Sequence, residues 1–292
     1  MGMPESGPRR NALGYTLNAH SPSLGGIESW RVVSISSMVL SPSRPNFSVS
    51  IALLMLLSCS SSSGQDALQL FHKMQTALGG ADKIAEIQDF EQSVRAQTWD
   101  NQGNPHGLVR KRTRWVRPNY LRLDQVGPDD TYLLYFDGTA GWEILPDKTV
   151  ADLVGGELKF AQNYLRDFNL NLWLTDRDPR KVITSPAPHV LAIADKGDRS
   201  GKLEITLDPV TSLPVKQTTL SLADPNNPVP SETRFDKWGT VGGVRFAGTI
   251  SIFQNGKKLG EITVEQTKVN SGIKPSDLAI KPTNLSPVMS QP

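Results

Sequence analysis

Residues 121–145 of the chain read LRLDQVGPDDTYLLYFDGTAGWEIL, and their pattern indicates short strands joined by tight turns. Polar and apolar side chains alternate at the start, and Tyr132, Leu134 and Phe136 then share one face of an extended segment. The intervening GPDD and DG segments contain the residue types that favour turns. Turn signals recur about every 8–12 residues, which predicts an antiparallel meander of strands.

The same pattern continues on both sides of this stretch. An Asn255-Gly256 pair is a typical hairpin signal. Further strands are expected at residues 90–100, 106–116, 190–194, 203–207, 213–222, 233–238, 244–253 and 259–269. A doubly wound parallel sheet is disfavoured because the strands do not alternate with helices.

Apolar residues recur at helical spacing in two places. Residues 66–78 begin at Asp66, a candidate N-cap, and stop at Gly79-Gly80, after which a short helical stretch reaches Ile87. Residues 157–174 are expected to form one helix on the concave face of the sheet. The order of helix, strands, helix and strands predicts one α+β domain with a large curved antiparallel sheet.

Short helices cannot wholly fill the hollow of so long a sheet, so an apolar cavity is expected beneath them. A tightly packed core is the alternative. Seven aromatic residues are candidates for the cavity lining, and each is also a candidate for plain core packing. They are Trp99, Trp115, Phe136, Trp142, Phe160, Phe168 and Trp173.

A basic run lies on one expected strand, where Arg110, Arg112 and Arg114 point the same way. One interpretation is contact with anionic lipid headgroups or with an acidic partner. The alternative is a solvated face balanced by acidic neighbours such as Asp124.

Composition excludes several function classes. The chain has 292 residues, of which 38% are hydrophobic, with one Cys and four His. A disulfide framework and a multi-Cys metal cluster are therefore excluded, and no metal or cofactor is expected. The residues after Asp66 are formally neutral, which argues against a nucleic-acid partner. No nucleophile elbow, zinc-protease, phosphate-loop or dinucleotide motif is present, so no catalytic residue is assigned and no enzyme is expected.

The first 65 residues differ from the rest of the chain. Residues 1–37 are interpreted as an over-extended gene start or, alternatively, as a disordered extension. Starting from Met38, Arg44 precedes the apolar run Val49–Leu57, which has the length of a signal-peptide core of about 7–15 residues. The run is shorter than the roughly 20 residues that a membrane-spanning helix needs. Residues 38–65 are therefore expected to be a signal peptide followed by a tether.

The only Cys follows this apolar run directly. Leu56-Leu57-Ser58-Cys59 resembles a bacterial lipobox, in which the Cys is acylated and becomes the mature N-terminus. Leu57 is larger than the usual residue at its position. The alternative is an ordinary secretory signal that is cleaved after Cys59. Either interpretation predicts export.

The chain also resembles a known family. The residues that carry this resemblance occur in a fixed order along residues 66–282. They are ALGGADKI (77–84), RPNYLR (117–122), FDGTAGW (136–142), LDPVTSLPV (207–215), GVRF (243–246) and Val269-Asn270. They resemble the periplasmic lipoprotein-carrier superfamily, the outer-membrane lipoprotein-sorting proteins of the LolA/LolB type. The resemblance implies a half-closed barrel whose helices plug the concave side and whose cavity binds acyl chains.

The leading hypothesis is an exported, non-enzymatic carrier or receptor of lipids or lipoproteins. If Cys59 is acylated, the protein is a periplasmic lipoprotein that is anchored to the outer membrane. The alternative is a structural or adaptor module of the cell envelope, which would hold a protein partner through a sheet edge or the basic strand. Residues 283–292 are expected to be a flexible tail.

Overall fold

The computed structural model describes residues 62–100, 103–126, 131–144, 149–197, 202–221 and 229–282. Thirteen of its strands form one sheet. In chain order these strands are β1 (Asp89–Trp99), β2 (Pro105–Val116), β3 (Tyr120–Val126), β4 (Thr131–Phe136), β5 (Gly141–Ile144), β6 (Val150–Asp152), β7 (Lys181–Ala187), β8 (Val190–Asp195), β9 (Leu203–Leu207), β10 (Pro214–Ser221), β11 (Val229–Asp236), β14 (Thr249–Gln254) and β15 (Lys257–Val269).

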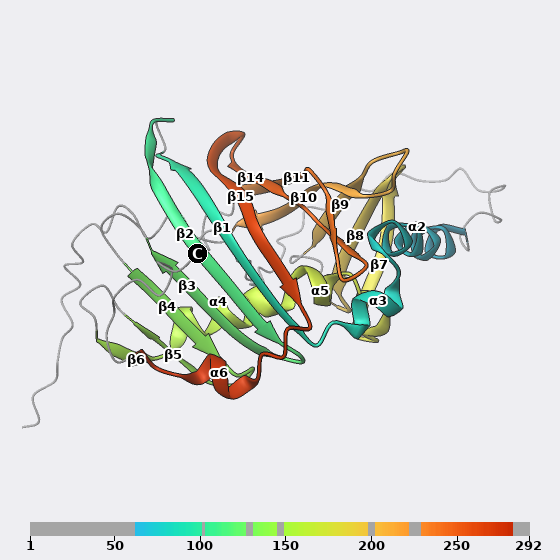
Figure 1. Ribbon diagram of the computed structural model, residues 1–292. Coiled ribbons are helices and arrows are strands. Elements are labelled where there is room, and N and C mark those ends of the chain that lie inside the picture. Colours follow the sequence, from blue (N-terminus) through green and yellow to red (C-terminus); the bar gives the residue numbers. More distant parts are fainter. Residues whose placement is uncertain are drawn as a thin grey trace, which may run out of the picture.

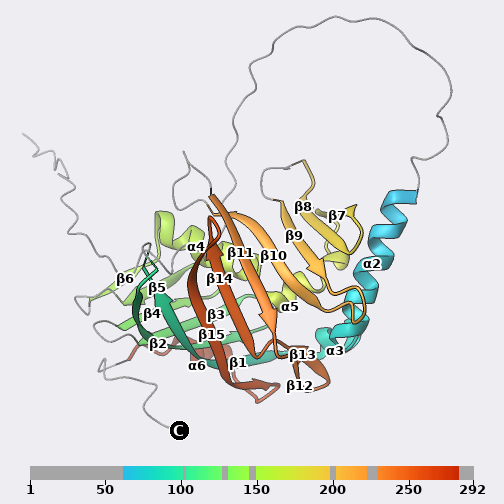
Figure 2. The ribbon, with the colours of Figure 1, turned by 90° about the horizontal axis from the view of Figure 1, so that it is seen from above.

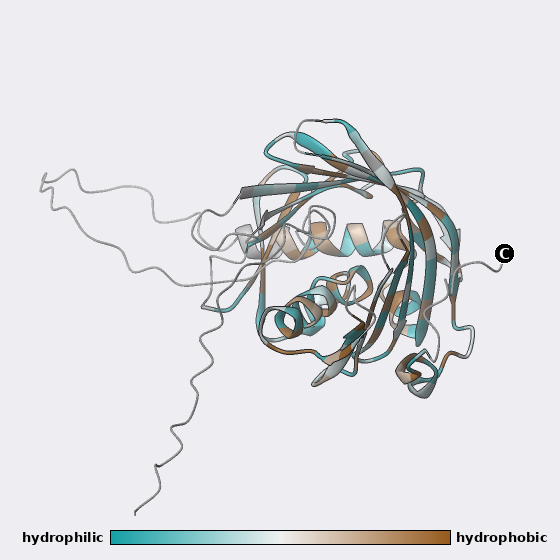
Figure 3. Ribbon diagram, turned by 90° about the vertical axis from the view of Figure 1, so that its left-hand side faces the viewer, coloured by the Kyte–Doolittle hydropathy of each residue, from teal (hydrophilic) through white to brown (hydrophobic). Residues whose placement is uncertain are grey.

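The strand order across the sheet is β6-β5-β4-β3-β2-β1-β15-β14-β11-β10-β9-β8-β7, and neighbouring strands pair antiparallel. The last strand, β15, pairs with the first strand, β1, and this pairing joins the two halves of the sheet. Figures 1 and 2 show the resulting curl, and Figure 3 shows the sheet wrapping around helices on its concave side. The prediction of an α+β fold with a large curved antiparallel sheet is confirmed.

The N-terminal helix α2 (Ser62–Leu78) packs against β7 and β8 at one end of the sheet. It begins at Ser62, so Asp66 lies inside the helix and the expected N-cap is wrong. The short helix α3 (Ala81–Glu86) follows Gly79 and Gly80, whose φ angles of 120° and 100° end α2 as predicted.

The internal helix is broken, where one continuous helix was expected. Helix α4 (Gly155–Arg166) and helix α5 (Asn169–Leu172) are followed by the short 3₁₀ turn Thr175–Arg177. The break lies at Phe168, whose ψ of 129° is extended, so that α5 starts in a new direction. The side chain of Asn171 donates a hydrogen bond of 2.8 Å to the Leu165 carbonyl and thereby ties the two helices together.

Residues 244–253 also form two strands, where one was expected. The first half, β13 (Val244–Phe246), pairs with β12 (Gly239–Val241) in a small separate hairpin, and the second half is β14. The chain turns between them because the amide of Gly248 donates to the Asp236 and Lys237 carbonyls, both at 3.0 Å. Strands β6 and β12 were not predicted because each has only three residues. Strand β7 was missed although its burial alternates, because Pro186 interrupts it near its end.

The main core lies between the concave face of the sheet and the helices. Phe71, Met74 and Leu78 of α2 are fully buried there at the spacing of one helix face. Gln75, on the same helix, donates through Nε2 to the Trp173 carbonyl at 2.8 Å. These contacts fix α2 against the segment that follows α4.

The C-terminal segment crosses the convex face of the sheet. Helix α6 (Pro275–Ala279) contacts β3 and β4 on the side opposite α4, and residues 283–292 lie outside the described residues. Cys59, the predicted signal segment and residues 1–37 also lie outside them. Among the described residues, none of the helices is long and apolar enough to cross a membrane.

Candidate functional site

A cavity of about 280 Å³ lies between helices α4 and α5 and the concave face of the sheet. Its walls come from both halves of the chain. The apolar wall residues are Phe90, Val94, Leu123, Tyr132, Phe160, Tyr164, Phe168, Leu170, Trp173, Phe235, Phe246, Ile250, Ile252 and Ile262. This size is near the lower limit of pockets that hold small organic ligands, about 300–1,000 Å³.

The helical wall is a row of aromatic rings. Phe160, Tyr164 and Phe168 are spaced four residues apart and therefore share one side of the α4 segment. The ring centroids of Phe160 and Tyr164 are 6.1 Å apart, and those of Tyr164 and Phe168 are 6.2 Å apart. Phe168 also packs edge-on against Phe90 at 5.4 Å. The three rings therefore pack the α4 segment against the concave face of the sheet, and they also border the cavity.

The strand wall opposite is aliphatic. Ile250 of β14 pairs with Ile262 of β15 and with Phe235 of β11, so these three side chains meet on one face of three adjacent strands. Each is only half-buried, because it borders the cavity. This wall offers a ligand apolar contact, and Thr233 of β11, which pairs with Ile252, borders the cavity beside it.

Polar groups line the cavity on two sides, at β2–β3 and at β10–β11, where Gln217, Thr219, Ser231 and Thr233 border it. Lys111 and Thr113 of β2 point to the same face, and Gln125 of β3 pairs with Lys111 in register. The hydroxyl oxygens of Thr113 and Tyr164 are 3.5 Å apart across the gap between sheet and helix. Burial lowers the pKa of the Lys111 ammonium to about 8 and raises the pKa of the Tyr164 phenol.

The predicted lining residues fall into two groups. Phe160, Phe168 and Trp173 border the cavity. Trp115 and Phe136 do not border it, because both are fully buried in the core beneath it.

The remaining two predicted residues also lie away from the cavity. Trp142 pairs with Tyr135 on the convex face, where the Arg122 guanidinium lies 5.4 Å from its ring centroid. Trp99 lies at the end of β1 under the Lys258 ammonium, 4.9 Å from its ring centroid. These four placements correct the sequence prediction. Alternation could not tell that Trp142 lies on the convex face, nor that Trp115 and Phe136, although on the concave face, are covered by the core.

Several wall residues were missed by sequence reasoning. Ile250, Ile252 and Ile262 follow the period of two that marks one face of a strand, so a signal for them was present. Tyr164 was recognised as part of a helical stripe but not as a cavity residue. Lys111 was counted with the basic run, although alternation places it on the face opposite Arg110 and Arg112.

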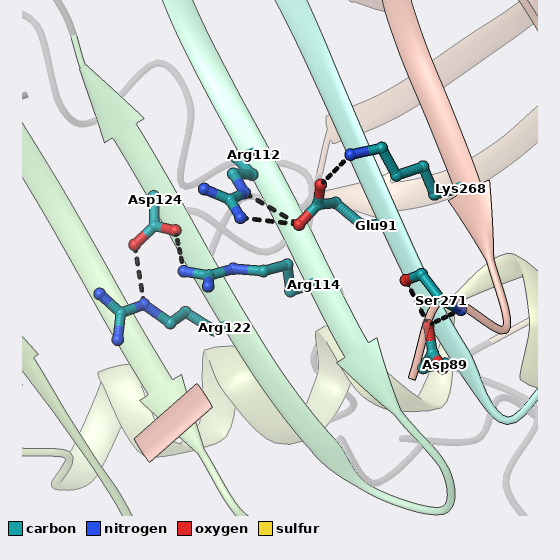
Figure 4. Close-up of polar contacts among 8 residues, drawn as sticks. All are labelled: Asp89, Glu91, Arg112, Arg114, Arg122, Asp124, Lys268 and Ser271. Atoms are coloured by element: carbon teal, nitrogen blue, oxygen red, sulfur yellow. Dashed lines mark hydrogen bonds and ion pairs between the residues drawn. The ribbon is translucent and has the colours of Figure 1, made fainter. Parts of the chain in front are cut away.

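The basic strand carries its arginines on the convex face, as Figure 4 shows. Arg112 Nη2 lies 2.8 Å from Glu91 Oε2, and Arg114 Nη2 lies 2.6 Å from Asp124 Oδ2. Burial acts to raise the pKa of Glu91, but Arg112 and Lys268 outweigh it and hold that pKa below its usual value. Two of the three predicted contact arginines are thus paired within the chain, while Arg110 is exposed.

Within the described ranges, no group of three or more His, Cys, Asp or Glu side chains is placed to hold a metal ion. The site offers a partly open volume with mainly apolar walls, hydroxyl and amide groups, and one ammonium. Such a set is suited to binding an amphiphilic molecule.

Solved structures of the LolA superfamily are similar to this chain. A domain named for outer-membrane lipoprotein sorting, from Vibrio parahaemolyticus, is 14% identical, with 74% of this chain and 97% of that one covered, at a TM-score of 0.49. A LolA superfamily protein from Nitrosomonas europaea is 14% identical, with 71% and 97% covered, at a TM-score of 0.47. A DUF1329 family protein from Desulfovibrio piger is 10% identical, with 73% and 96% covered, at a TM-score of 0.49.

These similarities are structural only. No protein-family model matches the chain, and no curated protein matches it in sequence. With identities of 14% or less and TM-scores below 0.5, these similarities assign neither a family nor a ligand to this chain. The ligand has to be inferred from the cavity itself.

Proposed function

We propose that this protein is an exported, non-enzymatic binding protein that takes an acyl chain of a lipid or lipoprotein into the cavity beneath α4. The observation that carries the proposal is the partly open volume of about 280 Å³, whose walls are mainly aromatic and aliphatic side chains. Each methylene group moved from water to such a wall contributes about 0.8 kcal/mol. No covalent chemistry is needed, because burial alone retains the ligand.

The two walls of the cavity suit a flexible alkyl chain. The α4 wall presents ring edges and faces, and the β14–β15 wall presents branched aliphatic side chains. The hydrogen-bonding side chains of the cavity lie outside these two walls, on β2–β3 and on β10–β11. An acyl chain matches the chemistry of both.

A cavity-filling variant tests this proposal. Ile250→Trp places an indole in the cavity, whereas Ser251→Trp places the same indole on the opposite face of β14. Each protein is produced with Cys59→Ala, so that a lipid anchor cannot contribute to the result, and is isolated from a bacterial periplasm. Its native mass is then measured before and after organic extraction. We expect an extractable lipid mass on the wild type and on Ser251→Trp, and little or none on Ile250→Trp. A wild-type protein that is folded and carries no extractable mass, and that binds no added acyl-chain probe, would contradict the proposal.

We also propose that Cys59 is acylated and anchors the protein to the outer membrane. The proposal rests on the apolar run before this Cys and on the small residue Ser58 that precedes it. Cys59→Ala should move the protein from the membrane fraction to the soluble periplasmic fraction and abolish the incorporation of labelled palmitate. A wild-type protein that already lies in the soluble periplasmic fraction and incorporates no label would show that the protein is a soluble secreted protein.

The adaptor alternative receives less support from the same structure. Arg112 and Arg114 are engaged by Glu91 and Asp124, so a partner would have to displace internal ion pairs in order to use them. The lipid-binding proposal needs no such rearrangement.

A further inference from the structure

We infer that the ligand is a neutral amphiphile, whose uncharged, hydroxyl- or amide-bearing head lies against β10 and β11 and whose alkyl chain extends to the aromatic floor of the cavity. The inference rests on the proposed function and adds the ligand's charge, head chemistry and orientation to it. It is carried by four neutral polar side chains of β10 and β11 that border the cavity, namely Gln217, Thr219, Ser231 and Thr233.

The four side chains form one patch because the register of the two strands brings them together. Gln217 of β10 pairs with Thr233 of β11, and Thr219 pairs with Ser231. Residues two apart on a strand share a face, so one amide and three hydroxyl groups lie on the same side of the cavity. None of these four side chains makes a hydrogen bond or an ion pair among the contacts that the structure describes.

This patch gains most from a ligand that forms hydrogen bonds. Ser231 is only 6% exposed, so its hydroxyl has little access to bulk water. A hydroxyl or amide that is removed from water costs free energy unless it finds a hydrogen-bond partner. A ligand head with hydroxyl or amide groups supplies such partners, whereas a plain alkyl chain does not.

The charged side chains at the cavity wall already have interactions within the chain. They are Lys111, Arg112, Asp124 and Asp167. Arg112 binds Glu91 and Asp124 binds Arg114 on the convex face, while Asp167 is paired with its neighbour Arg166 at 2.9 Å. Lys111 also has an interaction within the chain. An ionised head would have to compete with these interactions, and an uncharged head would not.

The polar side chains on the β2–β3 side are more engaged than the four on β10 and β11. The hydroxyl oxygens of Thr113 and Tyr164 lie 3.5 Å apart, and Gln92 Nε2 donates to Thr267 Oγ1 at 3.1 Å. Gln125 makes no hydrogen bond through its side chain among the described contacts. This side therefore offers one open amide, against four open groups on β10 and β11.

The floor of the cavity sets the orientation of the ligand. Phe246 packs against Phe90 at 5.5 Å and against Trp173 at 5.9 Å, so this end is closed by aromatic rings. Phe235 of β11 lies at the same end, where it lines a small pocket together with Trp173. Ser231 lies four residues earlier on β11, which is about 13 Å away at roughly 3.3 Å per residue. The alkyl chain therefore points to the floor and the head stays at the polar patch.

An equilibrium competition between matched amphiphiles tests the head chemistry. The full chain with Cys59→Ala is stripped of lipid and equilibrated at pH 7 with monododecanoylglycerol, methyl dodecanoate and dodecanoate at equal free concentrations. The bound ligands are extracted and quantified by mass spectrometry. The three probes share one acyl chain, while only the first has hydroxyl groups and only the last is charged. We expect monododecanoylglycerol to bind about tenfold more tightly than either of the others, because its two hydroxyl groups add hydrogen bonds to open neutral partners.

Variants of the patch locate the head. Thr219→Val combined with Ser231→Ala keeps the shape of the wall and removes two facing hydroxyl groups. It should abolish the preference for monododecanoylglycerol and leave the affinity for methyl dodecanoate nearly unchanged. The control is Thr218→Val combined with Ser251→Ala, which makes the same two changes on the convex face of β10 and β14. The control should keep the preference.

The outcomes distinguish the two proposals. Equal affinity for monododecanoylglycerol and methyl dodecanoate, or tighter binding of dodecanoate, would overturn the neutral head and would still support an acyl-chain cavity. A preference that persists without the Thr219 and Ser231 hydroxyls would overturn its placement on β10 and β11. Binding of none of the three probes would overturn the proposed function itself. The comparison of probes on the chain with its cavity unaltered decides the head chemistry even if the patch variant fails to fold.

Discussion

Arg122 and Asp124 lie two residues apart on the convex face of β3, with Arg122 Nε 2.9 Å from Asp124 Oδ1. Their side chains are only 5% and 2% exposed, so this is a buried ion pair on the outside of a curved sheet. It is buried because the C-terminal segment covers it. Arg122 also donates to the carbonyls of Leu278 and Ile280 at the end of α6.

Removal of the charge on Asp124 should destabilise the protein strongly. Asp124→Asn leaves Arg122 and Arg114 without their shared carboxylate in a buried setting, which costs about 3–5 kcal/mol in the free energy of unfolding. Urea unfolding followed by tryptophan fluorescence measures the loss. Glu265→Gln, which breaks the exposed pair between Glu265 and Arg95, is the control and should cost at most about 1 kcal/mol. Equal losses in the two variants would show that the convex network adds little stability.

Gly79 should tolerate no side chain, whereas its neighbour Gly80 should tolerate one better. Both have positive φ, but a Cβ on Gly79 would lie 2.2 Å from the Gly243 carbonyl oxygen, and a Cβ on Gly80 would meet no atom within 4 Å. Both alanine variants carry a backbone strain of about 1–2 kcal/mol. Gly79→Ala adds a cost of overpacking of about 1–3 kcal/mol. Thermal unfolding should therefore rank wild type above Gly80→Ala and Gly80→Ala above Gly79→Ala. The reverse order of the two variants would contradict the close approach of α2 to the β12–β13 hairpin.

Asp89 should hold the C-terminal segment to the start of β1. Its carboxylate accepts hydrogen bonds from the Ser271 amide at 2.8 Å, the Ser271 hydroxyl at 2.9 Å and the Gly272 amide at 2.9 Å. Asp89→Ala removes all three and should cost about 1–3 kcal/mol locally. Hydrogen exchange should then speed up in the peptide that spans α6 and leave β14 protected.

The control for this experiment is Asp137→Ala. Asp137 accepts from two backbone amides in an exposed turn, at 2.7 and 2.8 Å, and has no hydrogen bond to the C-terminal segment among the contacts that the structure describes. This variant should leave exchange in α6 unchanged. If both variants speed exchange there equally, Asp89 is not the anchor.

Lys111 should make the stability of the unliganded protein depend on pH. Its pKa is about 8 in the folded state and near its ordinary value of 10.5 when unfolded. Between pH 8 and 10.5 the unfolded chain therefore binds more protons, and the free energy of unfolding rises with pH through this window. The gain is at most about 3 kcal/mol, since one pKa unit corresponds to about 1.4 kcal/mol.

The difference between wild type and Lys111→Met isolates this contribution from other titrating groups. The titratable and charged side chains that border the same cavity are Tyr132, Tyr164, Arg112, Asp124 and Asp167, and all are retained in the variant. Lys111→Met should be the more stable protein at pH 7, and its advantage should shrink as the pH rises toward 10.5. An advantage that is constant with pH would mean that Lys111 is well solvated.

Much of the fold could be predicted from local patterns. The period of two around Tyr132, Leu134 and Phe136 marked a strand correctly, and the two glycines after Leu78 marked the end of α2. Hydrophobic periodicity and turn residues are local signals that extend over a few positions, so they can be recognised in the sequence alone. The continuation of helix through Phe168 was predicted wrongly, because its break depends on the packing of that ring against Phe90 and Trp115.

Less of the candidate site could be predicted from the sequence. Alternation shows that Arg112 and Lys111 lie on opposite faces of β2, but it does not show which face is concave. The curvature of the sheet, the closure of β1 by β15 and the position of α6 decide that. As a result, Trp142 lies on the convex face under the guanidinium of Arg122, and Lys111 borders the cavity.

The amino-acid sequence alone determined the class of fold, the positions of most strands, the C-terminal end of the first helix and the absence of known catalytic motifs. These features depend on residues that are close together in the sequence, so the sequence itself contains the information. The tertiary structure alone decided which side chains meet across the cavity, which arginines are already paired, and where one ammonium faces an apolar hollow. Such contacts join residues far apart in the chain, as between Asp89 and Ser271, which are 182 positions apart, and no local pattern encodes them.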